Sequence, residues 1–380
     1  MGSCIHVKVL LLLTLSNFKA IANEQSVSWA EIQALQNKIT QLKQHLNMQH
    51  KSPTTVQTAI LEKQRSQQPT QDHTILFSYA TIRPTFGVQN KHAGSHWYVR
   101  DSLSYVGFKA IHPFAKKWSA QLHGEWRFDT ANNNSIVSAR RAYTAITSPF
   151  GRVAIGKQRS IAYQFIADYI EMFNYSSNPL TYPPDTDFFI DNLLTYRYQQ
   201  EPFTLIAGAK FNGAGNDNQS DLVNIGVSYD NNDLHTGISF LSKEHYSKAQ
   251  WLGQDNVWVG TFVYKFNPRL YGALFYQAKH YQRYLETTDR NGFTLDLSLS
   301  YQLAKQYKLK TRAIAFDNDF PYSDIRNQAY TGYALTLEWQ PSPPLRVHIE
   351  YLNKDFDNQP DINALAVGLR YDFRHRLEVK

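Results

Sequence analysis

Strict alternation of apolar and polar residues is the feature of this sequence that most restricts its fold. From Phe293 to Tyr301 every odd-numbered residue is apolar and every even-numbered one is polar, and segments 223–229, 333–339 and 345–351 repeat the pattern. Successive side chains of a β-strand point to opposite faces of the sheet, so each segment predicts a strand with one apolar and one polar face. Such strands fit a boundary between lipid and water.

About sixteen such segments follow one another between Thr74 and Phe373, and an even number of antiparallel strands closes a barrel. Short and long connections alternate, as they do where short turns lie in the periplasm and long loops outside. The sequence therefore predicts an all-β fold, a transmembrane antiparallel β-barrel of about 16 strands. The predicted strands are 74–88, 103–112, 118–129, 138–148, 151–158, 192–200, 203–211, 222–230, 233–243, 256–266, 269–282, 292–303, 307–317, 329–340, 345–355 and 362–373.

A soluble β-sandwich is the main alternative for an alternating sequence. Its outward faces would be polar on both sheets, and it would need no regular succession of short and long connections. Aromatic residues favour the barrel, because membrane barrels carry an aromatic girdle at each interface and such residues flank the predicted periplasmic turns. These residues are Trp118, Phe150, Phe266, Tyr307 and Trp339.

The first 22 residues predict an export signal that is cleaved after Ala22. A cationic start at His6–Lys8 precedes the apolar run Val9–Leu15 and the small-residue pattern Ala20-Ile21-Ala22. The apolar run is too short to span a bilayer, and no later stretch approaches the roughly 18 apolar residues that a transmembrane helix needs. Any membrane-spanning part of the chain is therefore expected to be the barrel, residues 74–380.

Residues 23–50 predict a short periplasmic α-helical coiled coil, and residues 51–73 a flexible linker rich in Gln, Ser, Thr and Lys. The heptad seam consists of Ile32, Leu35, Ile39, Leu42 and Leu46. Roughly three heptads are marginal for an isolated coiled coil, so we expect a trimeric barrel to hold the copies together. Ile at heptad position a with Leu at d favours a coiled coil of two helices instead of three. The alternative to any coiled coil is an amphipathic helix packed on its own chain.

Charge and cysteine content agree with an exported protein without being specific to it. The net charge is +7, from 39 Lys and Arg against 32 Asp and Glu, and removing Lys8 and Lys19 with the signal leaves 37 against 32, or +5. The basic residues are dispersed, so we expect no nucleic-acid partner. Cys4, the only cysteine, lies in the signal segment, and a cysteine-free mature chain suits an oxidising compartment.

One connection is long enough to fold into the barrel. Residues 159–191 follow the fifth predicted strand and carry several acids but only one base, Arg159. A structureless loop of this length is uncommon and usually functional, and aromatic residues such as Phe165 and Phe188 indicate that it packs against the wall. Because the side chains at the narrowest point make a pore selective, this loop is the predicted constriction.

A series of short motifs in fixed order resembles the Gram-negative general (trimeric, sixteen-stranded) porin family over nearly all of residues 74–373. The motifs are Val106–Lys109, Gln121–Trp126, Arg140–Tyr143, Phe150–Gln158, Asp187–Phe189, Leu194–Arg197 and Gly368–Phe373. The resemblance implies an outer-membrane homotrimer, in contact with lipid and lipopolysaccharide, through which small hydrophilic solutes diffuse. The coiled coil ahead of the barrel is also similar in architecture to porins that take up small dicarboxylates.

The constriction of this family sets basic residues of the wall against acids of the inward loop. Carried over by position and alternation, the expected basic wall is Arg127, Arg140 and Arg197. The expected loop acids are Asp168, Glu171, Asp185 and Asp187.

Departures from the family pattern predict the selectivity. The loop motif Pro-Glu-Phe-Gly-Gly is replaced by Asn174–Asn178, Tyr105 stands where a wall arginine is common, and Arg127 where an acid is common. These departures make the electrostatic potential of the pore more positive than the family pattern would, and we expect a preference for small anions or carboxylates. The alternative is that the arginines pair with the loop acids. Seven residues, Arg374–Lys380, follow the aromatic residue at which many members end.

The sequence gives little support to enzymes and metal-binding proteins. No Gly-x-Ser-x-Gly motif occurs and the histidines are scattered, so no nucleophile with its base is predicted. Asp317-Asn318-Asp319 lacks the Gly and Glu of a calcium loop. We expect no enzyme, cofactor or metal. The second interpretation is a plugged structural or adhesive barrel whose residues 26–72 bind peptidoglycan or another partner.

Overall fold

The computed structural model describes residues 73–91, 94–132, 138–170, 172–174, 187–211, 221–247, 250–283 and 289–379. The predicted signal peptide and coiled coil, and all but the last residue of the linker, lie outside the described residues, so these domain assignments stay predictions.

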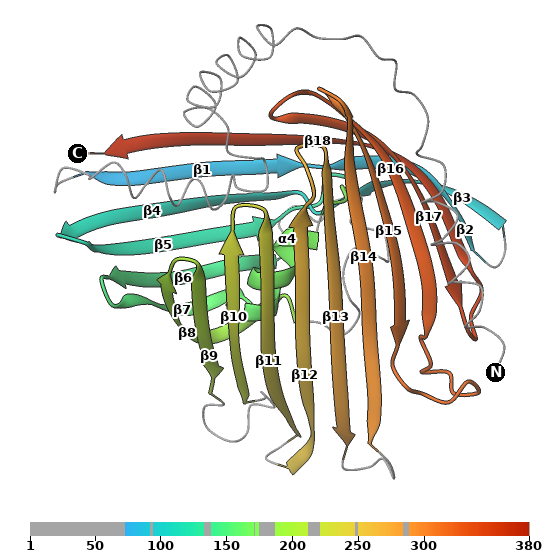
Figure 1. The fold of residues 1–380 in the computed structure, drawn as a ribbon, viewed down its shortest axis with the longest axis horizontal. Coiled ribbons are helices and arrows are strands. Elements are labelled where there is room, and N and C mark those ends of the chain that lie inside the picture. The colour runs from blue at the N-terminus through green and yellow to red at the C-terminus, as the bar shows by residue number, and fades with distance from the viewer. Residues whose placement is uncertain are drawn as a thin grey trace, which may run out of the picture. The chain divides into compact units, whose positions relative to one another are not determined.

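Long β-strands make up nearly all of the described chain (Figure 1). The strands are β1 (Thr74–Ile82), β2 (Pro84–Lys91), β3 (Gly94–Asp101), β4 (Tyr105–Ala115), β5 (Trp118–Arg127), β6 (Ser138–Ser148), β7 (Gly151–Arg159), β8 (Phe189–Gln200), β9 (Phe203–Lys210), β10 (Leu222–Asn231), β11 (Leu234–Ser247), β12 (Gln250–Lys265), β13 (Leu270–Arg283), β14 (Arg290–Ala304), β15 (Tyr307–Asp317), β16 (Tyr330–Ser342), β17 (Leu345–Phe356) and β18 (Ile362–Val379). A π-helical turn, η2 (Tyr163–Ala167), continues into α4 (Asp168–Ile170).

Two long strands are each broken into two segments. β1 pairs with the C-terminal half of β18 and β2 with its first half, so that β1 and β2 form one strand. β4 and β3 pair with β1 and β2 in the same way and form the next strand. When each broken pair is counted once, the eighteen segments form a closed antiparallel barrel of sixteen strands. The predicted fold class is confirmed.

Buried polar contacts accompany these breaks in the two strands. The amide of Arg83 donates to Ser104 Oγ at 2.9 Å, and the amide of Ser102 donates to the carbonyl oxygen of Arg83 at 2.8 Å. Leu103 between the two serines has a φ of 69°, outside the strand region. The sequence predicts a connection over residues 89–102, whereas β2 and β3 continue both strands into this segment.

All sixteen predicted strands are present, and the differences lie at their ends. The largest is in the second strand, which begins with β3 at Gly94 and not at residue 103. At the C-terminus, β18 continues from Phe373 to Val379. These added residues pair with β1, as in the register pairs Phe77–Arg376 and Ile75–Glu378. The C-terminal extension is therefore part of the strand that closes the barrel.

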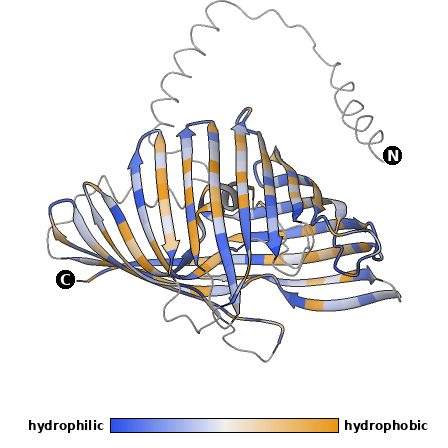
Figure 2. Ribbon diagram, turned by 90° about the horizontal axis from the view of Figure 1, so that it is seen from below, coloured by the Kyte–Doolittle hydropathy of each residue, from blue (hydrophilic) through white to orange (hydrophobic). Residues whose placement is uncertain are grey.

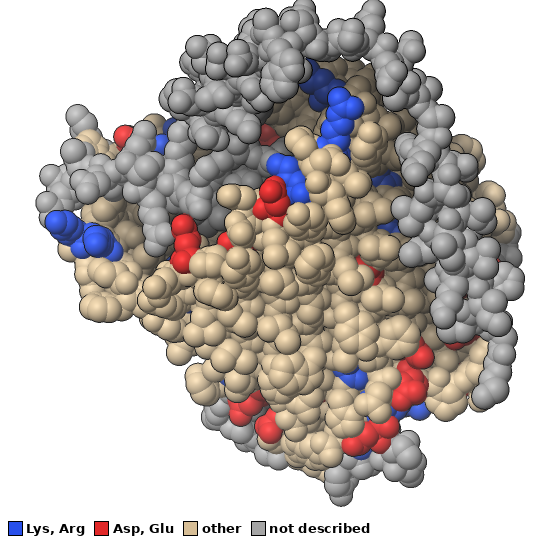
Figure 3. Space-filling view, viewed as in Figure 1, with Lys and Arg blue, Asp and Glu red and all other residues tan. Residues whose placement is uncertain are grey.

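Hydrophobic and hydrophilic residues alternate along the strands (Figure 2). The exposed residues of the strands are mostly apolar and many of the buried ones are polar, so the alternation separates an apolar outer surface from a polar interior. On β14, Leu295 and Leu297 are exposed, whereas the residues that alternate with them, Thr294, Asp296 and Ser298, are fully buried. An uncharged band covers the middle of the face drawn in Figure 3, and most charged residues lie above and below it. The five aromatic residues of the predicted girdle are all exposed. In the described part of the chain no helix is long and apolar enough to cross a bilayer.

Candidate functional site

The connection after β7 turns at once into the barrel. Its first residues lead into η2 and α4, which we call the loop helix (residues 163–170). Ile161 and Phe165 are buried in a core cluster with residues of β10 to β13. Two wall glycines permit this approach, since a Cβ at Gly226 would come 2.9 Å from Ile161 Cγ2 and a Cβ at Gly237 would come 3.2 Å from Phe165 Cβ. The structure therefore places this part of the connection inside the barrel.

Beyond the loop helix the connection reaches β15 and β16. Lys310 Nζ donates to the carbonyl oxygen of Met172 at 2.7 Å, and the side-chain amide of Asn174 donates to the carboxylate of Glu338. Phe173 is buried with residues of β15, β16 and β17, and the guanidinium of Arg312 lies 5.1 Å from its ring centroid. These contacts fix a second point of the connection far around the wall from the first.

The returning end of the connection is also attached to the wall. Asp187 forms a salt bridge of 2.8 Å with Lys243 of β11. The described part of the connection thus lies inside the lumen, packed against residues of β8 to β13 and of β15 to β18.

A β-bulge in β6 directs two consecutive arginines into this lumen. Glu125 pairs with Arg141 and Trp126 with Ala139, so Arg140 is the extra residue. Arg140 Nε donates to Glu125 Oε1 at 2.8 Å, and Arg141 Nε lies 3.8 Å from the same oxygen. Alternation predicted Arg140 inside, and it would have placed Arg141 outside. The bulge brings both arginines to one carboxylate.

Two further arginines face each other across β7 and β8. Arg152 and Arg197 are directly opposite in the ladder and half-buried, and both alternate with exposed, lipid-facing residues such as Val153 and Tyr196. Like charges directly opposite on neighbouring strands destabilise a sheet. In the part of the chain that the structure describes, neither guanidinium forms a salt bridge. The pair is a local excess of positive charge beside the open pore.

The remaining basic residues extend this wall. Arg127 ends β5, is half-buried and lies opposite Tyr105 of β4. Lys109 of β4 is close enough to Arg141 and Arg152 to interact with them electrostatically. The basic wall predicted from the sequence did not include Lys109, Arg141 or Arg152. Alternation along β4 and β7 could have identified Lys109 and Arg152, but no sequence signal marked the bulge that turns Arg141 inward.

The predicted loop acids are less completely placed. Asp168 opens α4, and its side chain is outside the described structure, as are Glu171 and Asp185. Asp187 forms its salt bridge with Lys243 on β11. Arg127, Arg140 and Arg197 lie on β5, β6 and β8. The guanidinium of Arg140 lies 5.1 Å from the ring centroid of Phe189, two residues after Asp187.

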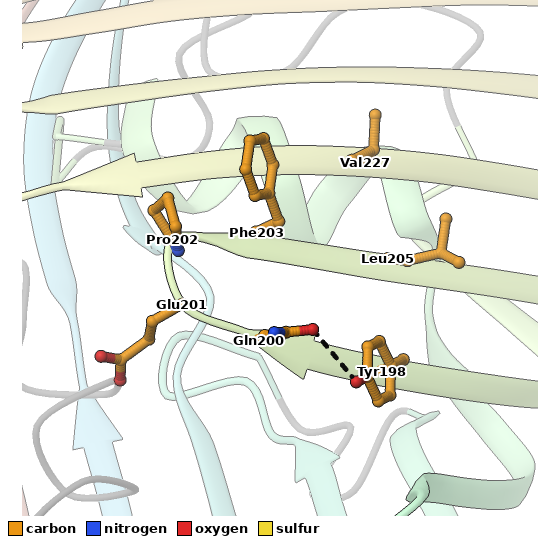
Figure 4. Close-up of a pocket in the computed structure, with 7 residues that line it drawn as sticks. All are labelled: Tyr198, Gln200, Glu201, Pro202, Phe203, Leu205 and Val227. Atoms are coloured by element: carbon orange, nitrogen blue, oxygen red, sulfur yellow. Dashed lines mark hydrogen bonds between the residues drawn. The ribbon is translucent and has the colours of Figure 1, made fainter.

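A pocket of about 390 Å³ lies outside the lumen, beside the short turn between β8 and β9 (Figure 4). Its lining residues are Tyr198, Gln200, Glu201, Pro202, Phe203, Leu205 and Val227. The aromatic and aliphatic members are exposed on the outward face of the strands. The pocket therefore belongs to the lipid-facing surface.

Comparisons with known proteins agree with this architecture. The family model of the Gram-negative porins matches residues 85–380. None of the curated proteins matches the chain. Among solved structures, the anion-selective porin from Comamonas acidovorans is 14% identical with a TM-score of 0.66, over 79% of this chain and 100% of that one. The trimer form of OmpT from Vibrio cholerae is 16% identical with a TM-score of 0.63, over 80% of this chain and 100% of that one.

The outer membrane channel DcaP of Acinetobacter baumannii is 11% identical, with a TM-score of 0.63 over 79% of this chain and 97% of that one. At these identities the likeness shows the fold alone. The family match covers more than half of the chain, including the inward connection and both arginine pairs. The chain therefore belongs to the Gram-negative porin family, whose members form outer-membrane channels and are not enzymes.

Proposed function

We propose that this porin passes small hydrophilic solutes with a preference for anions, carboxylates among them. The observation that carries the proposal is the Arg152–Arg197 pair, because the two residues are directly opposite in the ladder and, among the described residues, no carboxylate forms a salt bridge with either of them. An anion in the pore would relieve their repulsion, whereas a cation would add to it. Arg140 and Arg141 place two further guanidinium groups beside Glu125, on the same wall.

Guanidinium groups favour carboxylates in particular, because they present parallel N–H donors that match two carboxylate oxygens. The Comamonas structure is that of an anion-selective porin, which supports the proposal by analogy only. The alternative of a plugged structural barrel finds no support among these neighbours, which include porins and a channel.

The test measures reversal potentials of single channels in a potassium chloride gradient, for wild type, Arg152→Gln, Arg197→Gln and the double variant. A unit charge about 4 Å from an ion is worth ~1 kcal/mol in water, so each substitution should lower the anion-to-cation permeability ratio several-fold. Arg326→Gln is the matched control, because Arg326 pairs with Asp324 in an exposed outer loop. Cation selectivity of the wild type would contradict the proposal.

We further propose that the protein works as a homotrimer embedded in outer-membrane lipid and lipopolysaccharide. The trimer form of OmpT supports this assembly, and so does the predicted coiled coil. Residues 26–72 are the proposed site for contact with peptidoglycan, and co-sedimentation of the full chain with purified peptidoglycan, compared with a chain that lacks these residues, tests that contact.

A further inference from the structure

The pocket beside the turn between β8 and β9 is lined by side chains that face away from the lumen. Tyr198 lies opposite Leu205 in the ladder of β8 and β9, and Leu205 lies opposite Val227 in the ladder of β9 and β10. All three residues are exposed, and so is Phe203, two residues nearer the turn. The apolar row thus crosses three strands on the outer surface of the barrel (Figure 4).

The end of the pocket at the turn is polar. Gln200 and Glu201 line it there, and both are exposed. The hydroxyl of Tyr198 donates to Oε1 of Gln200 at 3.2 Å, so the amide oxygen is occupied and Nε2 keeps its N–H donors. Within the described ranges, the carboxylate of Glu201 forms no hydrogen bond and no salt bridge. The polar end therefore offers one negative charge and one neutral donor to a ligand.

The order of polar and apolar residues along the pocket matches the depth of a membrane leaflet. Short turns of such barrels lie at the periplasmic end, so we expect the turn between β8 and β9 there. Aromatic residues mark the level of the lipid headgroups. Tyr198 lines the pocket, and Phe203 packs edge-to-face on Tyr229 with ring centroids 5.3 Å apart. The polar end is thus at headgroup level, whereas Leu205 and Val227 lie deeper, at the level of the acyl chains.

The charge at the polar end selects the headgroup. A carboxylate such as that of Glu201 repels an anionic headgroup and attracts an ammonium. A zwitterionic headgroup also carries a phosphate, whose oxygens can accept hydrogen bonds from Nε2 of Gln200. A primary ammonium donates hydrogen bonds to a carboxylate, whereas a quaternary one cannot, because it has no N–H. The two polar groups therefore fit a zwitterionic phospholipid with a primary ammonium.

We propose that this pocket binds one phospholipid of the periplasmic leaflet, a phosphatidylethanolamine. Its ammonium pairs with Glu201, its phosphate accepts from Gln200, and one acyl chain lies along Leu205 and Val227. The pocket volume of about 390 Å³ is within the usual range of sites for small molecules. The inference rests on the chain being an outer-membrane barrel and is independent of its anion preference.

The experiment adds an equimolar mixture of phosphatidylethanolamine, phosphatidylcholine and phosphatidylglycerol with identical acyl chains to the full-length protein in detergent. Native mass spectrometry then counts the lipids of each kind that remain bound. The wild type should retain phosphatidylethanolamine about two- to fivefold more than either of the other lipids, which is the usual weight of one exposed ion pair. Equal retention of the three lipids would overturn the proposal.

Two variants test the headgroup and the acyl chain separately. Glu201→Gln keeps the size of the side chain and removes its charge, so the preference for phosphatidylethanolamine should disappear while the total number of bound lipids changes little. Leu205→Trp fills the apolar row with a residue that the membrane interface favours, so retention of phosphatidylethanolamine should fall to the level of the other lipids. Both side chains are on the outer surface, so we expect both variants to fold.

Asp233→Asn is the matched control, because Asp233 is an exposed acid of the next short turn and does not line the pocket. Its lipid retention should match that of the wild type. Equal losses of preference in Asp233→Asn and Glu201→Gln would mean that the net charge of this end of the barrel attracts the lipid, and would overturn the proposal. Retention of phosphatidylethanolamine that is unchanged in Leu205→Trp would overturn it as well.

A second copy of the chain is the other occupant that an apolar outer face can take. Replacing Leu205 by the photo-cross-linker benzoylphenylalanine, in the full-length protein in intact outer membranes, distinguishes the two. The variant should form no cross-linked protein dimers, and dimers would show that another barrel covers the pocket, which overturns the lipid site. The reversal potentials of the Arg152 and Arg197 variants do not depend on these results, so the two proposals can fail separately.

Discussion

At the scale of residues, the positive side of the lumen depends on side chains that ordinary strand rules would not bring together. Arg152 and Arg197 are like charges in direct register, and Arg140 and Arg141 are neighbours that regular alternation would send to opposite faces. Both arrangements cost stability in an ordinary sheet. The proposed anion preference accounts for a wall that bears this cost.

The register of β7 and β8 shifts between Gly156 and Gln158, which is a second bulge of this wall, and Gly156 provides the backbone conformation for it. Its φ is +124°, and an added Cβ would overlap the carbonyl oxygen of Ala142. We expect Gly156→Ala to lower the free energy of unfolding by about 1–3 kcal/mol, the usual cost of such a strained residue. Gly260→Ala is the control, because a Cβ there meets no atom within 4 Å. Urea unfolding in detergent measures both, and equal midpoints would refute the expectation.

At the scale of elements, the closing strand and the inward connection carry most of what is particular to this chain. β18 is 18 residues long and uses its two halves to pair with β1 and β2. The inward connection reaches the wall through backbone carbonyls, which accept from His235 and Lys310. Side chains of the connection contribute as well, since Asn174 donates to Glu338 and Asp187 pairs with Lys243.

Truncation after Phe373 tests the role of the C-terminal extension. It removes the strand partners of residues 74–79, so β1 loses most of its seam with β18, whereas β2 keeps its own. We expect slower assembly and a lower thermal midpoint, with an unchanged single-channel conductance, because the lost residues lie away from the loop helix. Removal of Lys380 alone is the control, since β18 ends at Val379. Unchanged thermal stability of the longer truncation would show that the extension is dispensable.

At the scale of the whole molecule, the barrel and the N-terminal segment should contribute separately to the assembly. The predicted seam at Ile32–Leu46 spans only about three heptads, which is marginal for a coiled coil on its own. We expect a peptide of residues 23–50 to show little helix by circular dichroism. The exported chain that lacks residues 23–73 should still close in three equal conductance steps, and single independent steps would show that the trimer depends on the N-terminal segment.

The sequence by itself determined the barrel fold, because the alternation of apolar and polar residues with a period of two shows which face of each strand meets lipid. It also located the long connection after the fifth strand. It could not show that Arg141 turns inward, since a bulge is a property of paired strands. Nor could it show that His235 meets Phe165 across 70 residues of chain. Those contacts depend on the register and closure of the barrel, which only the tertiary structure decides.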